Sequence, residues 1–444
     1  MEKYLTQTFA IPLHAGKPKS STGLIPADAR YEDEVFAGPI DWSKHQGLYQ
    51  VADKFFYSKY RAMTHSTDIK QPVKWHFNNS QFDAVDWQTR LGGDIRTLYA
   101  ARARQLREKY DYLIMAWSGG GDSHQALLSF LLNDIPLDEI MVAFPFTEAD
   151  KHHKADPNAT GPENFLSEWQ LTMKPLLDAV RMRWPEIKIT LADMKWAIEL
   201  GPDPEQEILY SNAAMPAFFT GHGRWRAFES VWAQRATEHK NICTIFGVGS
   251  VHVERFDSWL ATGFADQWCI WRSIVGASGP RKTEYFYWTP DMPEIVREQA
   301  HLMLDHFRRN PLDIGLLNWW TMNGWDKCWV MKQKGDNGAL RHMRRTVIYP
   351  DLPGRVYQVD KPRICHLNDD WNTWFRSNPH SKTFVDQHRW TINTAEAVID
   401  PAFFLSANGQ RLCAAPIYSA MYMIGRLPAV RNTHISRTLN LALA

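Results

Sequence analysis

Short apolar runs alternate with longer amphipathic segments through the middle of the chain. The runs have the length and composition of buried strands, and the segments between them place apolar residues three or four positions apart, as helices do. The predicted strands span 112–117, 139–144, 187–192 and 241–246, and the predicted helices span 94–109, 126–132, 169–183, 225–238 and 295–308. Because alternating strands and helices form βαβ units, the sequence predicts an α/β fold with a doubly wound parallel sheet.

The segments on either side of this α/β region have a different texture. Residues 1–94 have weak periodicity and many polar, turn-forming and aromatic residues, which predicts an N-terminal extension or cap. Residues 311–444 mix Trp, His and Arg, with a predicted hairpin at 346–359 and a predicted buried helix at 412–424, so we expect a C-terminal α+β region. The sequence thus predicts three domains, and the last of them is a substrate or interaction domain.

Composition and charge narrow the function classes. The chain has 444 residues, 44% of them hydrophobic and 22% charged, which is ordinary for a folded globular protein. Its net charge of +1 gives no broad attraction to nucleic acid or to an anionic membrane. The five cysteines contain no CxxC pair, which argues against a disulfide framework or a zinc cluster and favours a reducing compartment. Without a secretory signal pattern or an apolar stretch of about 18 residues, we expect a cytoplasmic protein with no membrane partner.

The polar stretch directly after the first predicted strand is the strongest candidate for chemistry. It reads Ser118-Gly119-Gly120-Gly121-Asp122-Ser123 and leads into a predicted helix. Glycines allow backbone N–H groups to approach a ligand closely, and a helix N-terminus adds partial positive charge, so phosphate is the natural occupant. The simpler alternative is a turn that caps the helix, with Asp122 or Ser123 as N-cap. Other nucleotide loops fit less well, because the chain has no GxxxxGK[ST] and carries His124 where a dinucleotide fingerprint needs glycine.

This stretch resembles the SGGxDS loop of the PP-loop ATP pyrophosphatase superfamily. That superfamily includes asparagine synthetase and GMP synthetase, and the phosphoadenosine-phosphosulfate reductases are close relatives. The resemblance covers roughly 95–310 and is specific over 110–132, so it implies a nucleotide-binding domain with a HUP-like sheet at 95–310. It also implies that the chain binds ATP and Mg²⁺, that a substrate oxygen attacks the α phosphorus, and that pyrophosphate leaves on the loop. The expected function is an AMP-forming ligase or adenylyl transferase.

The resemblance also implies roles for individual residues. The expected catalytic residues are Asp122, Ser123 and Ser118, and Asp122 is also the expected magnesium ligand. The expected nucleotide-binding residues are Ser118, Gly119, Gly120, Gly121, Asp122 and Ser123, with Gly247 and Gly249 at the end of the strand 241–246. Two glycines at a strand end permit close backbone approach. Polar residues that follow the other strands, 147–150, Asp193 and Lys195, are further candidates, and an ordinary solvated loop is the alternative for each.

Several functional alternatives stay open at the level of the sequence. A phosphoadenosine-phosphosulfate-reductase-like protein shares the fold but needs a thiol donor, whereas Cys243 lies in a predicted strand and Cys413 in an apolar segment. A nucleotide-binding structural or interaction protein would need no turnover. The acceptor substrate could be a nucleobase, an amino acid or a small metabolite. The Trp-rich and basic segment 319–345 is either a nucleic-acid platform or a packed Trp core with a basic rim, and the low net charge favours the core.

Overall fold

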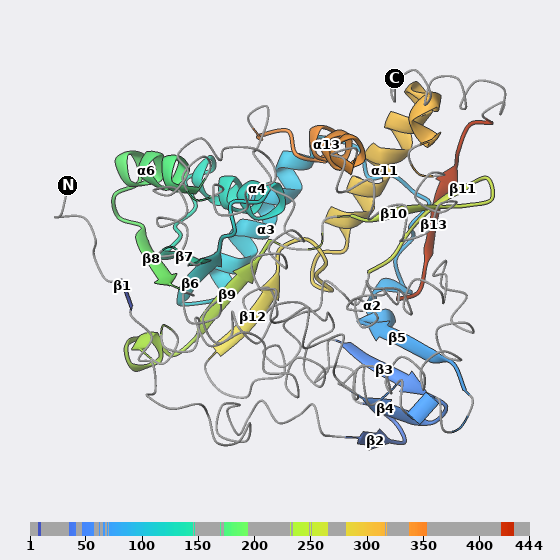
Figure 1. The fold of residues 1–444 in the computed structure, drawn as a ribbon, viewed down its shortest axis with the longest axis horizontal. Coiled ribbons are helices and arrows are strands. Elements are labelled where there is room, and N and C mark those ends of the chain that lie inside the picture. The colour runs from blue at the N-terminus through green and yellow to red at the C-terminus, as the bar shows by residue number, and fades with distance from the viewer. Residues whose placement is uncertain are drawn as a thin grey trace, which may run out of the picture.

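The computed structural model of the chain describes a central sheet, two smaller sheets and the helices that surround them (Figure 1). The described residues are 8–9, 35–40, 47–56, 62, 65–66, 69, 71–144, 146, 169, 173–193, 231, 234–247, 249, 251–264, 281–315, 317, 337–352 and 419–429.

The central sheet has six strands in the order β1-β8-β7-β6-β9-β12, and every neighbouring pair is parallel. Its strands are β1 (Thr8–Phe9), β6 (Tyr112–Ala116), β7 (Glu139–Phe144), β8 (Lys188–Asp193), β9 (Ile242–Phe246) and β12 (Arg281–Tyr285). The four strands that the apolar runs predict are confirmed as β6, β7, β8 and β9. The predicted α/β class with a parallel sheet is therefore confirmed.

Helices flank this sheet and follow most of the predicted boundaries. They are α2 (Asn79–Phe82), α3 (Ile95–Lys109), α4 (Gly121–Leu131), α6 (Lys174–Arg183), α11 (Glu294–Arg309) and α13 (Asn337–Ile348), with the 3₁₀ turn η6 (Pro311–Asp313) after α11. Asp94 caps α3, because its carboxylate accepts a hydrogen bond from the backbone N–H of Arg96 at 2.9 Å. Figure 1 shows α4 and α6 together along one side of the sheet.

The direction in which the chain adds strands to the sheet reverses between β6 and β9. From β6 the chain moves outward through β7 and β8, and then returns to the other side of β6 to form β9 and β12. Ala116 of β6 lies opposite Phe246 of β9, and Phe246 lies opposite Tyr285 of β12. The carboxyl ends of these three strands are therefore level, so the segments that follow them meet at one edge of the sheet.

The two smaller sheets are antiparallel, and the sequence did not predict them. One contains β2 (Val35–Ala37), β3 (Gly47–Val51), β4 (Lys54–Phe56) and β5 (Val73–Phe77), and the other contains β10 (Val253–Phe256), β11 (Trp259–Thr262) and β13 (Tyr422–Arg426). The predicted extension at 1–94 thus contains a sheet. Phe77 of β5 stacks on Phe264 with ring centroids 3.9 Å apart, which joins this sheet to the segment after β11.

Two predictions in the C-terminal region are wrong. Of the segment 412–424, which is predicted as a buried helix, residues 412–418 lie outside the described residues. In the described part, β13 begins at Tyr422 and pairs with β11, and the Tyr422 ring stacks on Trp87. The first strand of the predicted hairpin, 346–349, instead ends helix α13 at Ile348. Ile348 is fully buried and its carbonyl accepts a hydrogen bond from Tyr99, so packing overrides the strand preference of its β-branched neighbours. The remainder of that hairpin lies outside the described residues.

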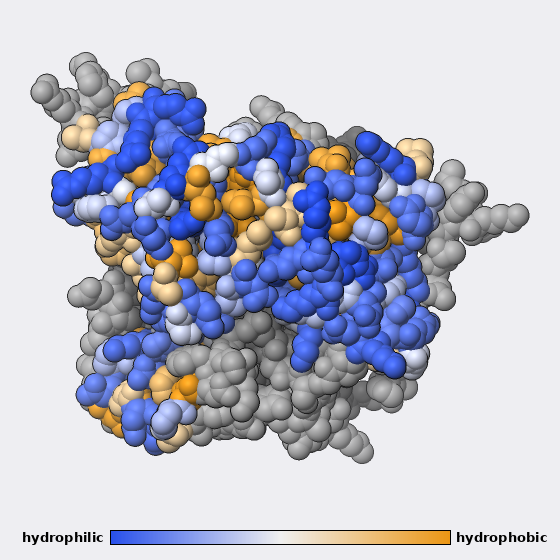
Figure 2. Space-filling view, turned by 180° about the vertical axis from the view of Figure 1, so that it is seen from behind, coloured by the Kyte–Doolittle hydropathy of each residue, from blue (hydrophilic) through white to orange (hydrophobic). Residues whose placement is uncertain are grey.

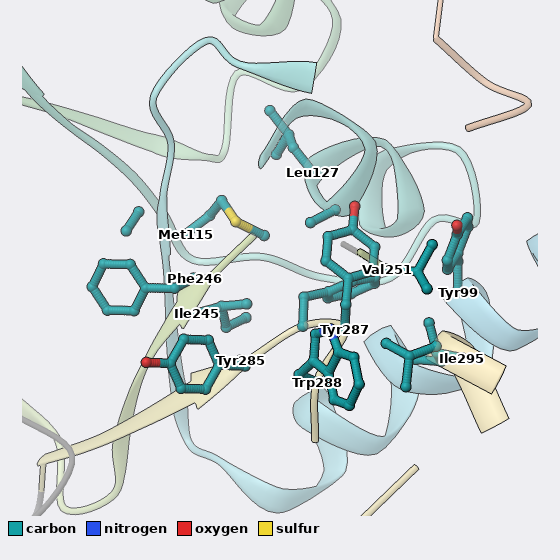
Figure 3. Packing of buried hydrophobic residues seen from close by; sticks show 14 of the residues in the cluster. Tyr99, Met115, Leu127, Ile245, Phe246, Val251, Tyr285, Tyr287, Trp288 and Ile295 are labelled. Carbon is teal, nitrogen blue, oxygen red and sulfur yellow. The ribbon is translucent and has the colours of Figure 1, made fainter. Parts of the chain in front are cut away.

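One hydrophobic core runs through all three predicted domains. It joins Tyr49 of the N-terminal sheet, Met115 and Ile245 of the central sheet, and Ile348 and Tyr422 of the C-terminal region. Figure 3 shows the central part, with Leu127 on α4 and Met115 and Ile245 on the neighbouring strands β6 and β9. The domain boundaries stay a prediction, and the described parts of the three ranges pack against one another.

On the surface, large hydrophobic side chains are scattered among hydrophilic ones, as the face in Figure 2 shows. Among the residues that the structure describes, the exposed ones are Ile69, Leu91, Leu132, Met182, Phe256, Leu312 and Met423. Single exposed hydrophobic residues of this kind are normal on globular proteins. No helix among the described residues is long and apolar enough to cross a membrane.

A buried ion pair joins the central sheet to the helical segment before β9. Glu139 at the start of β7 accepts two hydrogen bonds from the Arg235 guanidinium, at 2.7 and 3.1 Å, and a third from Tyr112 at 2.9 Å. The side chains of Glu139 and Arg235 are 0% and 1% exposed. Removing one member of such a pair leaves the other charge buried without its partner.

We therefore predict that Arg235→Met lowers the free energy of unfolding by about 3–5 kcal/mol. The matched control is Arg181→Met, because Arg181 pairs with Asp178 at 2.9 Å with both side chains at least a third exposed. This control should cost less than about 0.5 kcal/mol. Urea denaturation followed by circular dichroism measures both, and equal losses in the two variants would contradict the prediction.

Candidate functional site

The glycine-rich loop leads from the carboxyl end of β6 into α4, as the sequence predicts. The strand ends at Ala116, the helix begins at Gly121, and Gly120 is the N-cap in extended conformation. Gly119 has φ +72°, a left-handed backbone conformation that favours glycine. Neither Asp122 nor Ser123 is the N-cap, so that part of the simpler explanation is wrong, while a turn that only caps the helix through Gly120 stays the alternative to a phosphate loop.

Two serines hold the loop in shape. The Ser123 hydroxyl accepts a hydrogen bond from the backbone N–H of Ser118 at 3.2 Å and lies 3.1 Å from the Ser118 hydroxyl. It also donates to the carbonyl of Gly120 at 3.1 Å. Ser123 thus links the start of the loop to the first turn of α4. These contacts describe a fixed loop, and the predicted catalytic roles of the two serines stay predictions.

The first turn of α4 has the electrostatic character of an anion site. The first N–H groups of any helix have no acceptor within that helix, and they carry its partial positive charge. Here those groups belong to the glycine loop and to Asp122, with 11 residues of helix behind them. An anion at this point would satisfy donors that the helix itself cannot.

Two tyrosines from distant parts of the chain bind Asp122. Tyr287, which follows β12, donates to the Asp122 carbonyl at 2.7 Å, and Tyr349, which follows α13, donates to Asp122 Oδ1 at 2.7 Å. Figure 3 shows the Tyr287 hydroxyl directed toward α4. Burial raises the pKa of Tyr287 well above its usual range, and the neighbouring Tyr349 adds to this effect. Tyr287 therefore stays a protonated donor.

The end of β9 contacts the same turn of α4. A Cβ on Gly247 would lie 2.5 Å from Ser123 Cα, so only glycine fits there. Gly249 has φ +74°, and a Cβ on it would lie 3.0 Å from the Phe264 ring. Close packing alone therefore explains why glycine stands at both positions. The structure brings Gly247 to the loop, as expected of a shared site, while the nucleotide contacts of both glycines stay a prediction.

Side chains from two other helical regions lie against the loop. A Cβ on Gly119 would be 2.8 Å from Cγ of Met173, the residue before α6. A Cβ on Gly121 would be 2.8 Å from Nε of Arg345 on α13. The loop is therefore flanked by one apolar and one cationic side chain.

Two buried aromatic ring nitrogens beside the loop have no hydrogen-bond partner. They are Trp117 Nε1 and His124 Nδ1, and the two residues are 2% and 4% exposed with ring centroids 6.0 Å apart. Burial lowers the pKa of His124 to about 4, so the imidazole is neutral at pH 7. Buried polar atoms without partners are uncommon and need an explanation such as a ligand or water.

The predicted magnesium ligand stands without a cluster around it. Among the described residues, no group of three or more His, Cys, Asp or Glu side chains could hold a metal ion. Magnesium usually keeps several waters and binds through one or two carboxylates and the phosphates of the substrate, so Asp122 alone fits that kind of site. The assignment of Mg²⁺ to Asp122 stays a prediction.

Other candidates are only partly within the described structure. Asp193 ends β8, two strands away from β6, while 147–150 and Lys195 lie outside the described residues. Within the Trp-rich and basic segment 319–345, residues 319–336 with their four tryptophans also lie outside the described residues. Its basic end is described, and it brings Arg345 to the glycine loop.

The sequence interpretation missed three site residues. Tyr287 comes from the segment after β12, and the sequence pattern predicts no strand at Arg281–Tyr285, so the rule of strand carboxyl ends did not select it. Arg345 and Tyr349 are four positions apart, which is the spacing of one helix face, but the predicted hairpin concealed it. The helical spacing was the available signal.

Comparisons with known proteins supply no relative for this site. No family model matches the chain, and no curated protein or solved structure matches it. The function is therefore argued from the residues themselves.

His124 gives the site a testable pH dependence. Its pKa is about 4 in the folded protein and 6.5 in the unfolded chain, so the folded state binds fewer protons between these values and loses stability as the pH falls. From pH 7 to pH 5 we expect the wild type to lose about 2 kcal/mol more unfolding free energy than His124→Gln. Urea denaturation at both pH values measures this, and parallel losses would show that His124 is not the titrating group.

Proposed function

We propose that this chain binds ATP on the loop 118–123 and acts as an AMP-forming ligase or adenylyl transferase of the PP-loop type. One observation carries the proposal. The stretch Ser118 to Ser123 leads from a central parallel strand into a helix N-terminus, with Gly119 in the left-handed conformation that such a loop uses. In this position the backbone donors of a glycine-rich loop suit a polyphosphate.

The sheet topology supports the proposal. We interpret the order β8-β7-β6-β9-β12 as a doubly wound sheet, whose ligands bind outside the strand carboxyl ends where the strand order reverses. That reversal lies between β6 and β9, and Gly247 contacts Ser123 there. The glycine-rich loop and the carboxyl end of β9 therefore lie where ligands bind in a doubly wound sheet.

The proposed reaction breaks the bond between the α phosphorus and the oxygen that bridges to the β phosphorus. A substrate oxygen attacks the α phosphorus, and pyrophosphate leaves with the electron pair of the broken bond. The loop N–H groups would stabilise the charge that the leaving group gains, and Mg²⁺ shared between Asp122 and the phosphates would offset the remainder. An amine or ammonia would then displace AMP.

The reductase alternative lacks support from the described cysteine. Cys243 is fully buried in β9, and burial raises the pKa of its thiol well above the usual range, so it is a poor nucleophile. The other four cysteines lie outside the described residues. We propose a reducing cytoplasm as the compartment, because the five cysteines of the sequence contain no CxxC pair.

Gly120→Val tests the nucleotide site. The Gly120 backbone has φ −73° and ψ 154°, which valine adopts without strain, so the variant should fold. Its side chain would occupy the space of a phosphate and abolish binding of a non-hydrolysable ATP analogue, with Gly120→Ala intermediate. Isothermal titration calorimetry measures the affinities. Equal binding by all three proteins would place the nucleotide elsewhere.

The product of turnover tests the reaction class. With Mg²⁺ and a suitable acceptor, radiolabelled ATP should give AMP and pyrophosphate, because the β and γ phosphates leave together on the loop. Thin-layer chromatography separates these from ADP and orthophosphate. ADP as main product would refute the ligase, and tight ATP binding without turnover across acceptor classes would favour the non-catalytic nucleotide-binding protein.

A further inference from the structure

We propose that Arg345 of α13 binds the pyrophosphate portion of the nucleotide, so that the C-terminal helix α13 forms one wall of the phosphate site. The inference rests on the proposed function, and it adds to the site a phosphate-binding residue that lies outside the loop 118–123. Arg345 lies 222 positions after the last residue of the loop, by subtraction of 123 from 345.

The position of the Arg345 side chain is the first argument. A Cβ on Gly121 would lie 2.8 Å from Nε, 3.1 Å from Cδ and 3.2 Å from Cζ of Arg345. The guanidinium end of this side chain therefore packs against the backbone where α4 begins. Gly121 has to lack a side chain for the arginine to lie there, which links the third loop glycine to a residue on α13.

The hydrogen-bonding state of Arg345 is the second argument. Its Nε is buried and has no hydrogen-bond partner in the structure. The same is true of Nε of the neighbouring Arg344, so the position against Gly121 is what distinguishes Arg345. A guanidinium presents five donors in a planar fork that matches the oxygens of a phosphate. An unsatisfied buried donor is costly, and a phosphate on the neighbouring loop would satisfy it.

The anchoring of α13 is the third argument. Tyr349, four positions after Arg345 and so on the same helix face, donates to Asp122 Oδ1 at 2.7 Å. The Ile348 carbonyl accepts from Tyr99 at 2.6 Å. Asp351 accepts from Gln125 of α4 at 3.0 Å and from Arg96 of α3 at 2.7 Å. These bonds hold the end of α13 against α3 and α4, so Arg345 is positioned before any ligand binds.

A nucleic-acid role fits Arg345 less well. Its guanidinium lies against the loop and its Nε is buried, whereas a residue that tracks a nucleic-acid backbone stands on an open basic surface. The whole chain carries a net charge of only +1. Arg345 is therefore better placed to bind an anion on the loop than to bind the backbone of a nucleic acid.

Calorimetry on the full chain tests the proposal with pyrophosphate, AMP and a non-hydrolysable ATP analogue. Arg345→Gln should weaken pyrophosphate and the ATP analogue by about 10- to 100-fold, the loss expected for charge-assisted hydrogen bonds, and change AMP less than about twofold. Arg345→Lys, which keeps the charge without the fork, should be intermediate. The matched control is Arg344→Gln, which removes the same charge from the next position of the helix.

A second variant approaches the same contact from the loop. Gly121→Ala places a methyl group where Arg345 packs, and it should reproduce the selective loss of pyrophosphate affinity if the arginine is displaced. Thermal unfolding shows whether each variant is folded, and a fall in pyrophosphate affinity that AMP does not share cannot come from unfolding.

The possible results separate this inference from the proposed function. Unchanged pyrophosphate binding in folded Arg345→Gln overturns the role of Arg345 but leaves the loop as the nucleotide site. Equal losses in Arg345→Gln and Arg344→Gln overturn it as well, because they indicate general charge rather than a contact. If the wild type binds none of the three ligands, the proposed function fails and this inference fails with it.

Discussion

The contact between Gly247 and the first turn of α4 is the constraint on which the candidate site depends. Backbone meets backbone there, since a Cβ on Gly247 would lie 2.5 Å from Ser123 Cα and 3.0 Å from the Asp122 carbonyl oxygen. No rotamer change can relieve a clash of this kind. The contact fixes the distance between the end of β9 and the loop, and it lets Tyr287, after the neighbouring strand β12, reach the same carbonyl.

The four strands β6, β7, β8 and β9 of the central sheet could be predicted because most of their residues are buried. All five residues of β6 and of β9 are buried, so each appears in the sequence as a continuous apolar run. β13 and the end of α13 do not have this property. Residues 346–348 are Thr, Val and Ile, which favour strands by themselves, but the packing of Ile348 under Tyr99 makes them helical. Contacts distant in sequence decided both elements.

The candidate site also has a part that the sequence predicts and a part that depends on contacts between distant residues. The loop 118–123 is a continuous stretch, so its local chemistry was visible in the sequence. Tyr287 and Tyr349 lie 165 and 227 positions from Asp122 and reach it only through the level ends of β6, β9 and β12 and the docking of α13. A single sequence has no signal for such pairs. The residue types of Tyr287, Tyr349 and Arg345 do not indicate a site either, because the chain contains many other tyrosines and arginines.

In the proposed function an anion on the loop would lie beside the carboxylate of Asp122, so the other charges around the loop affect its binding. His124 is neutral at pH 7 and Tyr287 is protonated, so neither compensates the carboxylate of Asp122. An anion at the helix N-terminus would lie close to that carboxylate, and like charges at short range repel each other. The hydrogen bond from Tyr349 spreads the Asp122 charge, and Arg345 against Gly121 supplies positive charge on the other side of the turn. A magnesium ion between Asp122 and the phosphates would turn the remaining repulsion into attraction, so in the proposed function the carboxylate and the arginine act on the same anion in complementary ways.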